Sequence, residues 1–287
     1  MKPKVYFSKD ISPDTIVKLY EAVGLSLSGK VAVKVHSGEP GNQNFLRPEF
    51  WKPIIYKVNG TAVECNTAYE GGRHNTEAHL KTLEEHGWSP LFNTQILDGE
   101  GDDLVLDIKK GEKIKKNYVG RAIADYDGIL VLSHFKGHPM GGFGGALKQL
   151  SIGFASSYGK KYIHGVGDTD NFWGSDHDSF LISMAEAAST ITEMFSGRAV
   201  YINVMANMSV DCDCCAVAED PCMKDIGVLA STDPVAIDKA CLDLVYASTD
   251  PGRDHLIERI ESRNGKLTVE AAAKLGVGSM EYDLVEI

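Results

Sequence analysis

Four cysteines crowd into a short segment in the second half of the chain. Cys212, Cys214, Cys215 and Cys222 fall within eleven residues. Thiolates bind soft or borderline metals, and four of them can complete an iron–sulfur cluster or a tetrahedral zinc site. The spacing matches neither the C-x2-C-x2-C run of bacterial ferredoxins nor the paired C-x2-C of a zinc ribbon. We therefore predict a thiolate-bound metal whose type the spacing alone does not fix.

The number of ligands is open, because adjacent Cys214 and Cys215 point in different directions if the segment is extended. Cys65 follows another apolar segment and could replace one of them. The alternative is that some of these cysteines are small buried hydrophobes, a common role for this residue. That is the better interpretation for Cys241, which lies on the apolar stripe expected for a helix over 233–246.

A glycine-rich segment carries a second set of reactive side chains. Its candidate functional residues are His134, His138, Gly141, Gly142, Gly144, Gly145 and Lys148. Glycines let the backbone approach a ligand closely, and a helix that starts after them would offer free N–H groups to a phosphate or carboxylate. The segment fits neither the P-loop nor the dinucleotide-binding pattern, so no nucleotide is predicted. The alternative is a flexible connection between a strand and a helix.

Histidine and arginine side chains extend the candidate site. His134 and His138 are acid–base groups or metal ligands, and Lys148 adds a cation. Arg73, in the polar run 66–74, could grip a carboxylate or phosphate. The remaining candidates, His164, His177 and His255, are expected at the surface.

The acidic balance of the chain restricts its partners. A formal net charge of -11 argues against nucleic acid and against an anionic membrane surface. No apolar run approaches the roughly 20 residues that span a bilayer, and the first ten residues lack the apolar core of a secretory signal. We expect a cytoplasmic protein with reduced thiols, which favours metal binding over disulfides.

The strands and helices that position these residues are predicted to form an α/β fold. Its sheet is expected to be mostly parallel and covered by helices on both faces. A short strand is predicted at 4–8, and four apolar segments predict buried strands at 30–35, 61–65, 128–133 and 199–205. Helical patterns lie at 77–86, 177–196, 233–246 and 266–275. The 287 residues suit one α/β unit or two intimately joined subdomains. A subdomain boundary, or an exposed hairpin, is expected near the polar stretch 95–120.

The ends of the predicted strands indicate where the site lies. Polar segments that contain His36, Cys65, His134 and Cys212 follow four of them. Ligands of parallel α/β sheets bind beyond the carboxyl ends of the strands. The cysteine segment and the glycine-rich segment should therefore face one shared cleft.

Several motifs together resemble the uncharacterised family called domain of unknown function 362, whose members are often labelled iron–sulfur centre proteins. The resemblance spans roughly residues 30 to 250 and rests on the motifs at 67–73, 134–148, 210–215, 225–227 and 231–240. It implies a metal or cluster site and no established reaction. Many relatives carry a ferredoxin-like insert with further cysteines, but residues 158–168 in the corresponding area contain none. His138, the glycines and Lys148 are also similar to a catalytic segment of the nickel-pincer lactate racemase, which suggests proton transfer next to a carboxylate.

Three hypotheses follow from these patterns. The first is an iron–sulfur protein, with a 4Fe-4S cluster beside a site for a small carboxylate or phosphate and with a redox partner. The second is a zinc- or nickel-dependent isomerase or hydrolase in which His134 and His138 act as acid–base groups. The third is a metal-binding module without catalysis.

Overall fold

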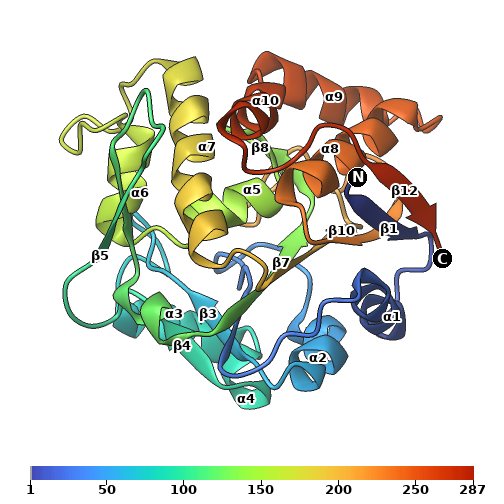
Figure 1. The fold of residues 1–287 in the computed structure, drawn as a ribbon, viewed down its shortest axis with the longest axis horizontal. Coiled ribbons are helices and arrows are strands. Elements are labelled where there is room, and N and C mark those ends of the chain that lie inside the picture. The colour runs from blue at the N-terminus through green and yellow to red at the C-terminus, as the bar shows by residue number, and fades with distance from the viewer. Residues whose placement is uncertain (1) are drawn as a thin grey trace.

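The central feature of the protein, seen in a computed structural model that describes residues 2–287, is an eight-stranded sheet (Figure 1). The strand order is β12-β1-β11-β10-β7-β2-β3-β4. Only β11 runs antiparallel to its neighbours, so the predicted mostly parallel α/β sheet is confirmed. The strands are β1 (Lys4–Ser8), β2 (Val31–Lys34), β3 (Thr61–Glu64), β4 (Thr94–Ile96), β7 (Gly128–His134), β10 (Ala199–Met205), β11 (Gly227–Ser231) and β12 (Asp283–Glu286).

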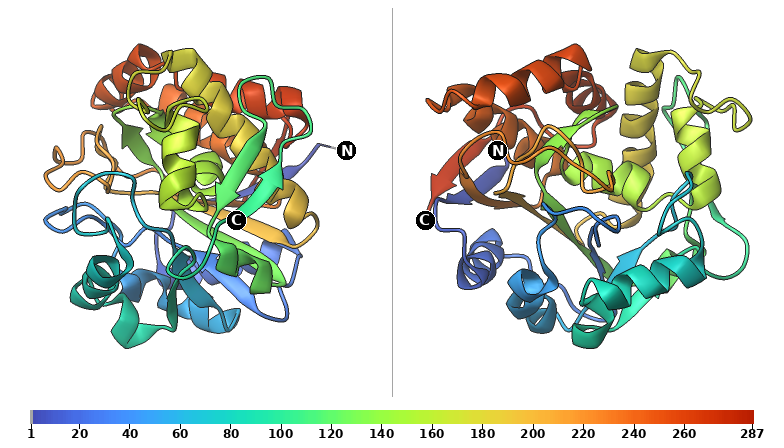
Figure 2. Two further views of the ribbon diagram at one scale, coloured as in Figure 1. Left: turned by 90° about the vertical axis from the view of Figure 1, so that its left-hand side faces the viewer. Right: turned by 180° about the vertical axis from the view of Figure 1, so that it is seen from behind.

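Helices cover both faces of this sheet, as predicted. On one face lie α1 (Pro13–Val23), α2 (Pro48–Lys57), α3 (Thr76–Glu85) and α4 (Trp88–Leu91). The opposite side holds α5 (Ala146–Lys148), α6 (Ser157–His164), α7 (His177–Met194), α8 (Pro234–Ala247), α9 (Arg253–Ser262) and α10 (Lys266–Leu275). Figure 2 shows the same two layers from the side and from behind.

The two inner strands show why the sheet needs both layers. Every residue of β7 and β10 is buried. Along β7, Leu130 and Leu132 pack against α1 to α4, whereas Ile129 and Val131 pack against the other layer. This period of two is the alternation that a strand imposes on its side chains. A continuous apolar sequence is therefore what a strand between two helical layers requires.

Two short hairpins and two irregular turns complete the fold. The polar stretch near 95–120 contains the hairpin of β5 (Leu104–Asp107) and β6 (Lys116–Val119), followed by the 3-10 turn η1 (Arg121–Asp125). The glycine-rich segment forms the hairpin of β8 (Lys136–His138) and β9 (Gly142–Gly144), and α5 then runs into the π-helical turn η2 (Gln149–Gly153). No helix within residues 2–287 combines the length and apolarity needed to cross a membrane.

Candidate metal centre

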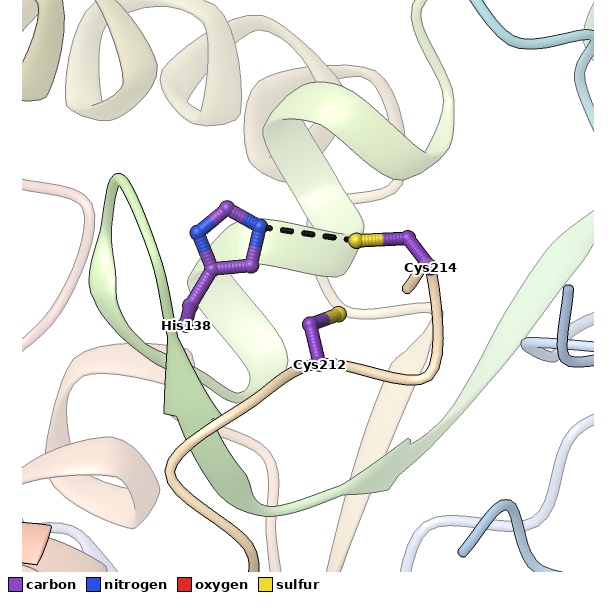
Figure 3. Close-up of side chains that lie close together, drawn as sticks. All are labelled: His138, Cys212 and Cys214. Carbon is purple, nitrogen blue, oxygen red and sulfur yellow. Dashed lines mark hydrogen bonds between the residues drawn. The ribbon is translucent and has the colours of Figure 1, made fainter. Parts of the chain in front are cut away.

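The cysteine loop, residues 206–226 between β10 and β11, lies beyond the carboxyl end of β10, and the β8–β9 hairpin follows the end of β7. Because β7 and β10 are parallel neighbours, both segments meet at the same edge of the sheet. There His138, Cys212 and Cys214 point toward one another (Figure 3), and their potential ligand atoms all lie within 4.8 Å of one another. These three side chains together could hold a metal ion.

Residues at the ends of three other strands hold the cysteine loop in place, as the strand-end pattern predicts. Asn42, after β2, donates from Nδ2 to the Cys215 carbonyl oxygen at 2.8 Å. Tyr69, after β3, donates from its hydroxyl to the Cys214 carbonyl at 3.3 Å. His134, at the end of β7, contacts Asp213 inside the loop itself. The shared site is thus fixed by tertiary contacts and not by the local sequence.

Cys212 has the environment of a thiolate. Burial raises the pKa of its thiol, but the hydrogen bond from Cys214 and the charges of Lys148 and Lys136 outweigh burial and bring that pKa well below the usual value. Lys148 Nζ lies 3.3 Å from Cys212 Sγ. The pKa of Cys214 is raised well above the usual value, first because of its hydrogen bonds to Cys212 and Cys215 and also because of burial. The pair therefore consists of one thiolate and one thiol.

His138 carries its proton on the nitrogen that faces the sulfurs. Its Nδ1 accepts hydrogen bonds from the backbone N–H groups of Met140, at 3.1 Å, and Gly141, at 2.8 Å. A flipped ring would place a carbon against both donors, which fixes the ring orientation. Burial and the nearby charge of Lys148 lower the pKa of His138, so the ring is neutral. Its proton then resides on Nε2, 3.9 Å from Cys214 Sγ.

His134 is engaged on both ring nitrogens and lies outside the group of potential ligands. Its Nδ1 lies 3.0 Å from both Asp213 carboxylate oxygens, and its Nε2 lies 2.6 Å from the Ala206 carbonyl oxygen. Lys136 Nζ donates to the same carboxylate at 2.6 Å. All three side chains are buried. This arrangement ties β7 and β8 to the cysteine loop and leaves His134 no nitrogen for a ligand.

The other predicted cysteine ligands lie outside the group of three. The half-buried Cys222 thiol donates to the Met208 carbonyl oxygen at 3.2 Å. Cys215 is half-buried, and its backbone N–H donates to the Cys212 carbonyl at 2.9 Å. Cys65 is buried after β3, where burial raises its pKa to about 12. It is therefore a thiol that donates to the Phe154 carbonyl oxygen at 3.3 Å.

The predicted anion-binding groups already have protein partners. The buried Arg73 guanidinium binds the carboxylates of Glu39, at 2.9 Å, and Glu64, at 3.4 Å. The N–H groups of Ala146 and Leu147 at the start of α5 donate to the Asp238 carboxylate at 2.8 and 2.9 Å.

The four predicted glycines of the glycine-rich segment lie where the backbone turns or approaches another group closely. Gly141, Gly142 and Gly144 form the turn and second strand of the hairpin. At Gly145 a Cβ atom would lie 2.4 Å from Asp238 Oδ1. Gly145 is therefore required for the approach of this protein carboxylate.

A cavity of about 90 Å³ opens beside the cluster. Its lining includes His138, Lys148 and Cys214, together with His36, Lys34, Lys160 and His164. The expectation that His164 lies at the surface is wrong: it is buried at the end of α6, stacks on Phe180 and donates from Nδ1 to the Lys160 carbonyl oxygen. A position at the carboxyl end of a helix that packs on α7 explains this burial.

Lys34 and Lys160 were not predicted at the site, and His36 was predicted there only as part of a polar segment after a strand. His36, after β2, is close enough to Cys212 to hydrogen-bond it, and burial lowers the pKa of this histidine to about 4. Lys34 is a charged residue inside a fully buried parallel strand, which is the sequence signal that could have identified it. Lys160 carries no comparable signal, because it lies in an ordinary amphipathic helix.

Comparisons with known proteins place the chain in a family. Residues 31–243 match the family described as Domain of unknown function (DUF362), and the chain belongs to that family. No curated protein is detectably similar in sequence.

Two solved structures show a distant similarity to this chain. The lactate racemase apoprotein from Thermoanaerobacterium thermosaccharolyticum is 16% identical with a TM-score of 0.49, and the alignment covers 85% of this chain and 58% of that one. A Thermotoga maritima protein is 12% identical with a TM-score of 0.43, covering 91% of this chain and 58% of that one. The chain thus spans little more than half the length of both.

Proposed function

We propose that this chain is a metal-dependent enzyme that transfers a proton on a small anionic substrate, with Cys212 and Cys214 holding the metal. The observation that carries the proposal is the convergence of two sulfurs and one imidazole beside a cavity lined by cationic side chains. Thiolate ligands suit zinc, nickel and iron.

The donor set fits a single ion better than a cluster. Cys212 is already a thiolate, and Cys214 needs to lose one proton to become a second ligand. A cluster held by four thiolates would require Cys215 and Cys222 to join them, and both lie outside the group. When bound, such an ion supplies Lewis-acid polarisation of a substrate oxygen.

His138 is assigned the proton transfer and not a place among the ligands. A metal-bound histidine usually donates its other N–H to an acceptor. In this chain Nδ1 receives two N–H donors, so the proton must sit on Nε2. This nitrogen faces the sulfurs of Cys212 and Cys214 (Figure 3). His138 can therefore deliver the proton to a ligand held there, and Lys148 keeps Cys212 ionised.

Metal analysis of protein prepared without oxygen tests this function. We expect about one zinc, nickel or iron per chain without sulfide, and loss of the metal in Cys212→Ser and Cys214→Ser. Cys222→Ser is the matched control and should retain it. Several irons with inorganic sulfide and broad visible absorption would establish the iron–sulfur cluster instead.

The role of His138 has its own variant. His138→Gln should change metal affinity by less than about tenfold, because the proton-bearing Nε2 is not a ligand. Loss of the metal in this variant would make His138 a ligand and contradict the assigned proton transfer.

A further inference from the structure

Two lysines of the cavity wall are buried without the partners that buried charges usually have. Lys34 is 1% exposed and Lys160 is 7% exposed. Among residues 2–287, neither forms an ion pair, and each ammonium donates to one backbone carbonyl, Lys34 to Val35 and Lys160 to Ala155. A lysine ammonium has three N–H donors. Each therefore has two donors for which the chain supplies no acceptor.

The other charges around the cavity are paired with one another and leave one negative charge in excess. Arg73 pairs with two glutamates, and Lys148 faces the Cys212 thiolate. Glu64 is the single acidic residue in the lining, and besides Arg73 it accepts a hydrogen bond from the Ser37 N–H. Its charge also acts on Lys34, but the two lysines together keep an excess of positive charge.

We propose that Lys34 and Lys160 bind the negatively charged oxygens of the substrate, which is a small oxyanion such as a short carboxylate. This inference deepens the proposed function and rests on it, because the anion would lie in the cavity that Cys214 and His138 also line. Burial lowers the pKa of Lys34 to about 8 and lowers that of Lys160 as well, so a bound anion would remove an electrostatic penalty.

The size of the cavity limits the ligand. A dry cavity of about 150 Å³ accommodates benzene. A cavity of about 90 Å³ is smaller, so it accepts roughly four or five non-hydrogen atoms. Gly153 contributes to this space, since a Cβ there would lie 2.8 Å from Lys34 Cε. Acetate and phosphate fit these limits, whereas benzoate exceeds them.

Anion-dependent stabilisation of the metal-free chain tests the pair directly. Acetate and inorganic phosphate are titrated against sodium chloride at matched ionic strength, and the unfolding temperature is followed. At least one of the two should raise it in the wild type, and benzoate should not. Acetate alone indicates a carboxylate site, and phosphate alone indicates a tetrahedral oxyanion. In Lys34→Met and Lys160→Met we expect binding weakened by about tenfold or more. The half-buried neighbour Lys161 lies outside the cavity lining and offers the control Lys161→Met, which should bind as the wild type does.

Two further readouts keep the test decisive. Gly153→Ala retains both charges but crowds the Lys34 ammonium, so it should weaken the same anion even if a lysine variant fails to fold. Equal stabilisation of all variants, or no stabilisation of the wild type by any anion, would overturn the inference. Measuring metal binding separates the two proposals. Metal binding without anion binding would contradict only this inference. Anion binding without metal binding would contradict the proposed function.

Discussion

At the residue scale, successive side chains around Asp213 point in opposite directions, and this determines which of them reach the candidate metal centre. Cys212 and Cys214 face His138, whereas Asp213 between them turns to His134 and Lys136. These two neighbours hold the pKa of Asp213 well below its usual range in spite of burial. One short segment thus presents its sulfurs on one side and anchors itself on the other.

Asp213→Asn tests this anchor. The change leaves the buried Lys136 ammonium without its carboxylate, and breaking a buried ion pair in this way costs about 3–5 kcal/mol of unfolding free energy. Asp211→Asn is the control, because its carboxylate is partly exposed on Arg259 and its loss should cost less than about 1 kcal/mol. Urea unfolding measures both. Equal losses would mean that Asp213 carries no special structural role.

At this scale, the sequence identified residues whose type and crowding are unusual. It did not identify ordinary residues that become unusual only through burial and tertiary contacts. The crowding of cysteines, His138 and Lys148 led directly to the cluster. Which cysteines converge depends on how the loop folds against β8, and that is set by contacts distant in sequence such as His134 with Asp213. The burial of Lys160 likewise depends on the packing of α6 against α7.

At the element scale, the β8–β9 hairpin brings His138 to the cysteine loop, and Gly137 makes this approach possible. The Gly137 N–H donates to the Ser209 carbonyl oxygen at 2.8 Å. A Cβ atom at this position would lie 2.3 Å from the Val210 carbonyl oxygen, which is backbone and cannot rotate away.

Gly137→Ala should therefore separate the hairpin from the loop. We expect a loss of about 1–3 kcal/mol of unfolding free energy from overpacking, together with weaker metal binding. In the same hairpin Gly144→Ala is the control, since its Cβ would come no closer than 3.4 Å, to the flexible Lys148 side chain. Retention of both stability and metal affinity in Gly137→Ala would contradict this role of the glycine.

The start of α5 gives the chain a pH-dependent stability. Burial raises the pKa of Asp238, which caps this helix, to about 6 from 3.8. The folded chain thus binds this proton more tightly than the unfolded chain does. The contribution of Asp238 to stability is fully present below about pH 4 and is lost as pH rises through about 6, by roughly 3 kcal/mol.

Asp238→Asn isolates this effect. Chemical unfolding between pH 4 and pH 7 should show the wild type losing stability relative to the variant as pH rises. Parallel profiles would show that Asp238 does not titrate in this window.

The elements with strong patterns were predictable, and the short ones were not. The long apolar strands β7 and β10 and the helices α7 and α8 match the predicted ranges closely. Strands β4 and β12 have only three and four residues, too few for a periodic pattern. The β8–β9 hairpin was not predicted, because glycine is depleted in strands, and it forms through its contacts with the cysteine loop and α9.

At the scale of the whole molecule, the fold places His138, Cys212 and Cys214 together at one edge of a mostly parallel sheet. The fold class followed from continuous apolar strands that alternate with helices. The antiparallel β11 was not predicted, and it returns the chain beside β10 after the cysteine loop. The loop is therefore held at both ends by neighbouring strands of the same sheet.

The central claim is a single metal ion held by two sulfurs of this loop, and X-ray absorption spectroscopy of the metal-loaded chain tests it most directly. The account predicts two sulfur neighbours, at about 2.3 Å if the ion is zinc, with lighter atoms completing the shell and no second metal nearby. The sulfur signal should persist in Cys222→Ser and fall in Cys214→Ser. Four sulfurs with a neighbouring iron, or no sulfur at all, would contradict it.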